Sequence, residues 1–397
     1  MKGKKALTII FSIAGCIVMF FGLQRLVQPK YASDILEGNF TREYYEETTK
    51  HDVLMVGDCE VYENFNPMYL WKNYGITSYI RGNAQQLAWQ SYYMLEDALK
   101  YETPKVVIYN VQSLTHDKPQ REEYNRMALD GMKWSKTKYD AVKASMCEGE
   151  EILDYVFPML RYHQRILDLS KEDIQYYWKD RKITHNGYYM RIDVLPVSES
   201  DVADPTWLLG SEEEKENTDD VIADPWADVE GAEEAASEGK ISEDTDLAKK
   251  STKGEPFGTY PLQYLDKMRE LCEKHGIRLI LIKAPSLAPQ WYDSDNEQVL
   301  AYAEKYQLPY INFYELLEET GIDYETDTYD GGLHMNLSGA NKLSEYLGRV
   351  LIEEYGMEDH RNDAELSAVY DEKYCFYEDM IKKQQEELEQ YGAIENY

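Results

Sequence analysis

The fold of this chain is indicated by the stretch Asp52-Val-Leu-Met-Val-Gly57-Asp58-Cys59-Glu60-Val-Tyr62, in which an apolar run ends at a turn. Residues 53–56 are continuously apolar, which is typical of a strand covered on both faces. Gly57 permits a sharp exit, so the next side chains lie at the carboxyl end of the strand, where open α/β sheets bind ligands. Cys59 is therefore either a reactive thiol at that edge or a small side chain that packs in the core.

A second informative stretch is Asp330-Gly-Gly-Leu-His334-Met-Asn336-Leu-Ser-Gly339-Ala340, which precedes a helical pattern over residues 341–355. Together the two stretches resemble the SGNH/GDSL hydrolase superfamily over most of residues 52–355. Cys59 occupies the place of that family's nucleophilic Ser, and His334 occupies the place of its catalytic His. The resemblance is nearest to the membrane-anchored SGNH-like proteins of bacterial envelopes, which include the alginate O-acetylation proteins and the D-alanyl transfer protein of teichoic acid modification.

Two features depart from the family pattern. The nucleophile is a Cys, and the usual Asp-x-x-His spacing is stretched to Asp330-x-x-x-His334. A thiol paired with an imidazole is a competent nucleophile for acyl transfer, because a neighbouring His⁺ lowers the pKa of a Cys by several units. Asp330 is the first candidate for the carboxylate that orients His334, and Asp327 is the second. The alternative is that both are ordinary turn residues.

The resemblance also implies two oxyanion donors. We predict a second strand over residues 76–80, with Gly82 in the loop that follows it, and a third strand that ends at Asn110. The alternatives are an ordinary turn glycine and a strand-end Asn that turns or caps the backbone. The five cysteines and the histidines show no metal-ligand spacing, so we expect neither a metal nor another cofactor.

The N-terminus carries a candidate membrane anchor. Three lysines within residues 2–5 precede an uncharged apolar run over residues 6–23, which spans ~27 Å as a helix and is just long enough for a bilayer core. The lysines favour a cytoplasmic N-terminus, with everything after Arg25 outside the cytoplasm. A cleaved signal peptide is the rival interpretation, and a lipoprotein-like box ending at Cys16 is a further one.

The composition argues against proteins that bind nucleic acid or anionic lipid. The chain has 74 acidic and 42 basic residues and a net charge of −32, so it is repelled by nucleic acid and by anionic lipid surfaces. We therefore expect no nucleic-acid partner. Residues 198–255 are dense in Glu, Asp, Ser and Ala and contain too few apolar side chains to offset the entropy of ordering, which predicts a disordered insertion.

Strand and helix patterns alternate along the rest of the chain, with further strands expected at residues 277–282 and 309–313. Parallel strands separated by helices predict an α/β fold with a three-layer, doubly wound parallel sheet, which is SGNH hydrolase-like and flavodoxin-like. The expected parts are a cytoplasmic N-terminus (1–5), a transmembrane helix (6–23), a juxtamembrane connector (24–50), the α/β domain (51–356) with a helical insertion (117–189) and the acidic insertion (198–255), and a charged helical tail (357–397).

We therefore expect a membrane-anchored, extracytoplasmic ester hydrolase or O-acyltransferase of the SGNH type that acts on a cell-envelope glycan or acyl ester through Cys59, His334 and Asp330. The resemblance implies the substrate class, a bacterial cell membrane with a single pass, and a membrane acyltransferase as partner. The alternative is a catalytically inactive protein of the same fold that binds envelope glycan or scaffolds a modification complex. The replaced Ser and the stretched acid–His spacing favour that alternative.

Overall fold

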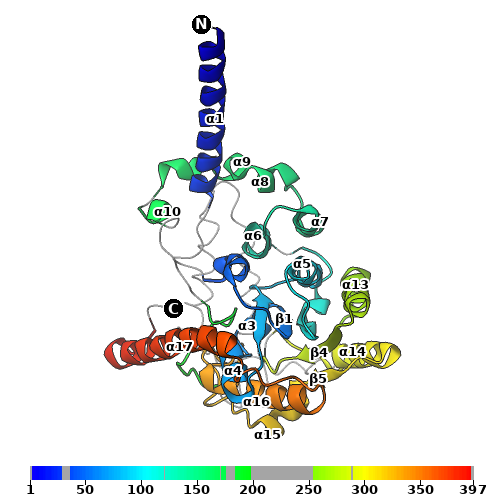
Figure 1. Ribbon diagram of the computed structural model, residues 1–397. Coiled ribbons are helices and arrows are strands. Elements are labelled where there is room, and N and C mark those ends of the chain that lie inside the picture. The colour runs from blue at the N-terminus through cyan, green and yellow to red at the C-terminus, as the bar shows by residue number, and fades with distance from the viewer. Residues whose placement is uncertain are drawn as a thin grey trace, which may run out of the picture.

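One sheet of parallel strands organises the described part of the chain (Figure 1). The computed structural model describes residues 2–28, 36–119, 121–169, 171–175, 184–197, 254–287 and 289–394. In sheet order the strands are β2 (Ser78–Gly82), β1 (Val53–Gly57), β3 (Val106–Asn110), β4 (Arg278–Lys283) and β5 (Tyr310–Asn312). This is the strand order of flavodoxin-like doubly wound sheets, and it confirms the predicted α/β class with a parallel sheet.

Helices cover both faces of this sheet. Alternate strand residues enter two separate apolar clusters, Met55 and Ile108 on one face and Leu54 and Val107 on the other. The first face is covered by α3 (Cys59–Tyr62), α4 (Pro67–Tyr74), α16 (Leu337–Glu353) and α17 (Ala364–Tyr391). The second is covered by α5 (Ala88–Ala98), α13 (Thr259–His275) and α14 (Asp293–Tyr306). Successive side chains of each strand point to opposite faces of the sheet. Both faces are therefore apolar and covered by helices, which gives the domain three layers.

The remaining elements are short, apart from α1. Before the sheet lie α1 (Lys2–Val27), η1 (Leu36–Asn39), α2 (Phe40–Glu43) and η2 (Tyr44–Glu46), where η marks a 3₁₀ helix. After β3 come η3 (Val111–Thr115), α6 (Glu122–Asp130), α7 (Lys136–Ser145), α8 (Ile152–Val156), α9 (Pro158–Tyr162), η4 (His163–Leu167) and α10 (Lys171–Gln175). After β5 come η7 (Phe313–Leu316) and α15 (Leu317–Thr320).

The second strand begins and ends two residues later than its pattern predicts. Gly75 ends α4 in the left-handed conformation, with φ of 68°, and the Ile76 N–H then donates to the Leu70 carbonyl at 3.3 Å. Ile76 therefore completes the helix cap and is not available to begin the strand. Gly82, which we expected in the following loop, is the last residue of β2.

Within the insertion expected to be helical over residues 117–189, the described helices lie between residues 122 and 175, and the described segment 184–189 is not helical. Residues 184–189 form a turn with a bridge between His185 and Tyr188, and the Asn186 carbonyl accepts a hydrogen bond from the Ile80 N–H at 2.9 Å. The Asn186-Gly187 pair has φ of 57° and 81°, and a Cβ at Gly187 would lie 2.1 Å from the Ile80 carbonyl oxygen. The turn therefore covers the edge strand β2, and only glycine fits at its second position.

The C-terminal tail forms the helix that its pattern predicts and docks on the domain. Tyr370 of α17 is fully buried and stacks on Trp71 of α4 with ring centroids 4.0 Å apart. The acidic insertion predicted for residues 198–255 lies outside the described residues except for its last two. In the described part of the chain one helix segment, Ile9–Val27 of α1, is long and apolar enough to cross a membrane.

Candidate active site

Cys59 is the first residue of α3 and follows the carboxyl end of β1 after Asp58, the helix N-cap residue. The turn depends on Gly57, because a Cβ there would lie 2.5 Å from Val61 Cγ2 and 3.1 Å from Asn110 Cβ. The close return of α3 over the end of β1 therefore requires glycine at this position. Cys59 is partly exposed, so the turn presents its thiol at the sheet edge where α/β folds bind ligands.

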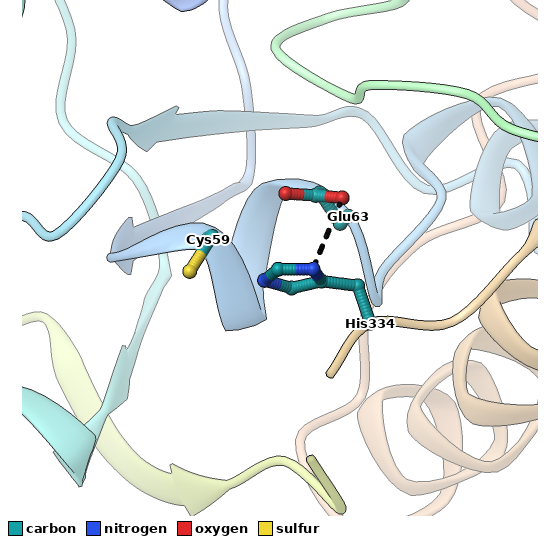
Figure 2. Close-up of side chains that lie close together, drawn as sticks. All are labelled: Cys59, Glu63 and His334. Atoms are coloured by element: carbon teal, nitrogen blue, oxygen red, sulfur yellow. Dashed lines mark ion pairs between the residues drawn. The ribbon is translucent and has the colours of Figure 1, made fainter. Parts of the chain in front are cut away.

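His334 lies beside this thiol although it is 275 positions further along the sequence. A ring nitrogen of His334 lies within 4.8 Å of Cys59 Sγ, and Figure 2 shows the Nε2 edge of the ring turned toward Cys59. The two segments are joined by Asn64, whose Oδ1 accepts the Met335 N–H at 2.8 Å. The chain after α3 thus fixes the loop that carries His334.

Asp330 contacts His334 although the sequence separates the two by one residue more than the family pattern does. Its Oδ2 lies 2.6 Å from His334 Nδ1, and its Oδ1 accepts the His334 backbone N–H at 2.8 Å. One carboxylate therefore holds both the backbone and the ring of His334. The second candidate, Asp327, is buried elsewhere, where its Oδ2 accepts hydrogen bonds from Lys342 Nζ at 2.5 Å and from the Asp323 N–H at 2.8 Å. The structure brings Asp330, and not Asp327, to the histidine.

Glu63 is a second carboxylate at the same ring, and the sequence analysis missed it. Its Oε2 lies 3.6 Å from His334 Nδ1 (Figure 2). The Tyr329 hydroxyl donates to the same oxygen. Tyr329 in turn stacks near the His334 ring, with centroids 6.2 Å apart. Glu63 follows Cys59 by four residues, the spacing that places two side chains on one helix face, and this spacing was the signal available in the sequence.

A buried ionic network lies next to the thiol. Asn110 at the end of β3 donates from Nδ2 to Asp58 Oδ1 at 3.1 Å and to Glu60 Oε2 at 2.9 Å. Glu60 also pairs with the buried Lys283 at 2.8 Å, and Asn110 Oδ1 accepts the Ala284 N–H at 3.1 Å. Asn110 therefore uses its side chain to connect the carboxyl ends of β1, β3 and β4. Its predicted role as an oxyanion donor stays a prediction.

Gly82 lies opposite Gly57 in the β1–β2 pair. A Cβ at Gly82 would lie 3.1 Å from the Gly57 carbonyl oxygen and 3.4 Å from the Asp58 carbonyl oxygen. Its backbone therefore borders the turn that carries Cys59, which is the neighbourhood expected of an oxyanion donor. That role also stays a prediction.

The electrostatics of the site favour a neutral thiol and a charged imidazole. Burial raises the pKa of Cys59 to about 11, against the opposing charge of His334. Burial alone would lower the pKa of His334, but nearby negative groups, Glu63 first, outweigh it and raise that pKa well above its ordinary value. Burial and the neighbouring Glu60 raise the pKa of Asp58 to about 7. Both shifts favour a protonated Cys59 and a protonated His334.

The same atoms are the ones that could hold a metal within the described part of the chain. Cys59 Sγ, a Glu63 carboxylate oxygen and a His334 nitrogen lie within 4.8 Å of one another, and they are ligand types that Zn²⁺ accepts. Two of the three already have protein partners, because Tyr329 donates to Glu63 and Asp330 binds His334. A metal would have to displace those contacts. Acyl transfer by Cys59 would not, because in that reaction Asp330 orients His334 through the same contact.

Comparison of the chain with protein-family models, with curated proteins and with solved structures found no match in any of the three.

Proposed function

We propose that this protein is a membrane-anchored, extracytoplasmic ester hydrolase or O-acyltransferase of the SGNH type, with Cys59 as nucleophile and His334 as acid–base group. The observation that supports this proposal is the row of groups Cys59 Sγ, His334 and Asp330 at the carboxyl edge of the sheet. Acyl transfer needs a nucleophile, a base within reach and a group that orients the base, and these three side chains supply one of each.

The proposed reaction proceeds in two steps. Once the imidazole is neutral, the Cys59 proton passes to His334 Nε2, and the thiolate attacks the ester carbonyl carbon to form a tetrahedral oxyanion. The C–O bond then breaks, His334 returns the proton to the leaving alcohol, and the acyl group remains on sulfur as a thioester. Water or an acceptor hydroxyl attacks the thioester, gives its proton to His334, and releases the acyl product and the thiol.

The substrate class that we propose is an acyl ester on a cell-envelope glycan. It rests on the SGNH resemblance and on the anchor, which would keep the domain close to the outer face of a bacterial membrane. A thioester transfers its acyl group readily to a second hydroxyl, so Cys59 suits transfer between acceptors as well as hydrolysis. A membrane acyltransferase that supplies the acyl group is part of this proposal.

The test is hydrolysis of a small acetyl ester by the full chain and four variants. We expect Cys59→Ala and His334→Ala each to lower the rate by about 10²-fold or more, because each removes a reacting group. Cys59→Ser should keep part of the activity, since a hydroxyl can replace the thiol. Cys375→Ala, which removes an exposed thiol of α17, is the matched control and should match the parent chain. Equal background rates in all five proteins would reject catalysis at Cys59.

A second candidate is a binding or scaffolding protein that keeps the hydrolase fold without turnover. Two observations favour it, namely the raised pKa of the Cys59 thiol and the commitment of both Nδ2 hydrogens of Asn110 to carboxylates. Calorimetric titration with an O-acetylated envelope oligosaccharide separates the two candidates. Binding without product release, at equal affinity for the parent chain and Cys59→Ala, would support the binding protein.

A further inference from the structure

Four short helices of the insertion lie around the C-terminal end of α1, and we call α8, α9, η4 and α10 the juxtamembrane helices. Figure 1 shows α9 and α8 on one side of that end of α1 and α10 on the other. Their contacts to α1 are specific. Gln24 Oε1 accepts the Met159 N–H at 2.7 Å, and the Val27 carbonyl accepts a hydrogen bond from Arg165 Nη1 at 3.0 Å. The last turns of α1 are thereby fixed to these helices.

A further contact places the juxtamembrane helices beside the apolar part of α1. The Phe157 ring packs against that of Phe20 with centroids 6.0 Å apart. Phe20 lies inside the membrane-length segment Ile9–Val27 and precedes its end by seven residues, which is ~10 Å along the axis. If the bilayer ended below Phe20, the apolar run from residue 6 would fill only ~22 Å of a hydrocarbon core of ~30 Å. A bilayer that α1 spans must therefore reach the level of Phe157.

The surface of these helices carries a cluster of exposed aliphatic side chains among polar ones. Nine valine, leucine or isoleucine side chains after α1 are exposed among the described residues, and six of them fall within residues 153–174, at 37% to 86% exposure. These six are Leu153, Val156, Leu160, Ile166, Leu167 and Ile174. Clustered exposed aliphatic side chains are unusual on a soluble surface and are typical of helices that lie in a membrane interface.

The opposite face of the juxtamembrane helices packs on the domain. Tyr155 and Tyr162 are buried, and both rings lie against the Arg126 guanidinium, at 4.0 and 5.1 Å from it. Arg126 belongs to α6, which contacts the body of the protein through α7. The helices are therefore two-sided, with aromatic residues toward the domain and aliphatic residues away from it.

We propose that the juxtamembrane helices lie in the outer interface of the bilayer that α1 spans, with Leu153, Leu160 and Leu167 among the acyl chains. The lipid is the occupant that the structure favours, because the exposed apolar surface is continuous with the apolar face of α1 through Phe20 and Phe157. The domain is then held against the membrane at two places, by the helix that crosses it and by the helices that lie on it. This inference does not depend on the chemistry proposed for Cys59.

The test measures depth in the membrane with the full chain reconstituted in phosphatidylcholine vesicles. An environment-sensitive dye is attached to Leu160→Cys in a chain whose native cysteines are replaced, Cys272 by Ala and the others by Ser. Nitroxide-labelled lipid and aqueous iodide serve as quenchers. The matched control carries the dye at Tyr391→Cys, an exposed position at the end of α17 that Figure 1 shows away from α1.

We expect lipid nitroxide to quench the Leu160 dye at least about threefold more than the Tyr391 dye, and iodide to show the reverse preference. Iodide quenching equal at both positions would overturn the proposal, because the helices would then face water. Protection of the Leu160 dye from both quenchers would also overturn it, because a protein and not lipid would cover the helices.

A charge substitution tests the same surface with the dye at a second position of these helices. With the dye at Leu153→Cys, Leu160→Glu should lower quenching by lipid nitroxide at least about twofold, since a carboxylate is expelled from the acyl chains. Leu300→Glu makes the same change at an exposed leucine of α14 and should leave the signal unchanged. Leu160 is already exposed, so the substitution leaves the core intact. An equal effect of the two substitutions would contradict the proposed contact with lipid.

Discussion

His334 has two carboxylates within reach of one ring nitrogen, Asp330 at 2.6 Å and Glu63 at 3.6 Å. An imidazolium gains from both, whereas a neutral imidazole can donate its Nδ1–H well to only one. The pKa of His334 is therefore raised well above its ordinary value, which disfavours the neutral imidazole. Glu63 also raises the pKa of Cys59, so this one side chain opposes both deprotonations on which acyl transfer depends.

The first prediction concerns the alkylation rate of Cys59 by iodoacetamide at fixed alkaline pH. Glu63→Gln should raise the rate several-fold, because removal of a negative charge lowers the pKa of the thiol. His334→Ala should lower the rate, because it removes the charge that favours the thiolate. The rate is read site by site by mass spectrometry, with the exposed Cys375 as internal reference. A slower Cys59 in Glu63→Gln would contradict this account of the site.

Asp58 gives a second prediction, on the pH dependence of stability. Its pKa in the folded protein is about 7, so the folded state binds this proton more tightly than the unfolded chain, whose Asp pKa is near 4. The free energy of unfolding should therefore fall as pH rises from about 4 to about 7, by on the order of 2–4 kcal/mol from this residue.

Asp58→Asn should remove that fall, because an amide keeps the hydrogen bond from Asn110 and has no proton to lose. The measurement is urea unfolding at pH 5 and pH 8 for the parent chain and the variant. Asp168→Asn, at an exposed position, is the control and should change neither value by more than about 0.5 kcal/mol. An unchanged pH dependence in Asp58→Asn would show that the carboxylate of Asp58 is not the group responsible.

At the level of elements, the sequence predicted the strands well and the site in part. The apolar runs of β1, β3 and β4 are buried on both faces, and such runs are visible in a sequence. The motifs around Cys59 and His334 indicated that these two segments belong to the candidate site. Tyr329 and Lys283 were missed because each acts through a partner that is distant in the chain, and no local pattern records that partner. Glu63 was also missed, although its spacing of four residues from Cys59 was a local signal.

The docking of α17 was also beyond the sequence, since a charged helical pattern fits an extended tail as well as a packed one. The third prediction follows from its contact with α4. Tyr370→Ala should lower the free energy of unfolding by about 3–4 kcal/mol, because the buried ring and its stacking on Trp71 are lost. Tyr370→Phe should lower the free energy of unfolding by about 1 kcal/mol, because the hydrogen bond between the hydroxyl and Asn186 is lost.

The measurement for α17 is urea unfolding of the full chain in detergent micelles, followed by tryptophan fluorescence. Tyr391→Ala removes an exposed ring from the end of the same helix and should change the stability by less than about 0.5 kcal/mol. If Tyr370→Ala were no more destabilising than Tyr391→Ala, α17 would not be part of the folded core.

The whole chain has a net charge of −32, and its acidic body is joined to an apolar helix. The two parts favour different surroundings, and the proposed single-pass topology would provide them, with α1 in lipid and the domain in water. The lysines before α1 favour the arrangement in which the domain lies outside the cytoplasm. Two of the native cysteines report on this arrangement, because Cys16 lies within the membrane-length segment of α1 and Cys375 is exposed on α17.

The last prediction is that a membrane-impermeant maleimide labels Cys375 in intact cells and leaves Cys16 unlabelled. In the proposed topology Cys375 lies in the aqueous part of the protein, whereas the acyl chains of the bilayer surround Cys16 and exclude a charged reagent. Cys375→Ser identifies the labelled site, and lysed cells give the maximum signal. Labelling of Cys375 only after lysis would place the domain in the cytoplasm. Because an envelope glycan lies outside the membrane, that result would also exclude the proposed substrate class, whatever the reactivity of Cys59.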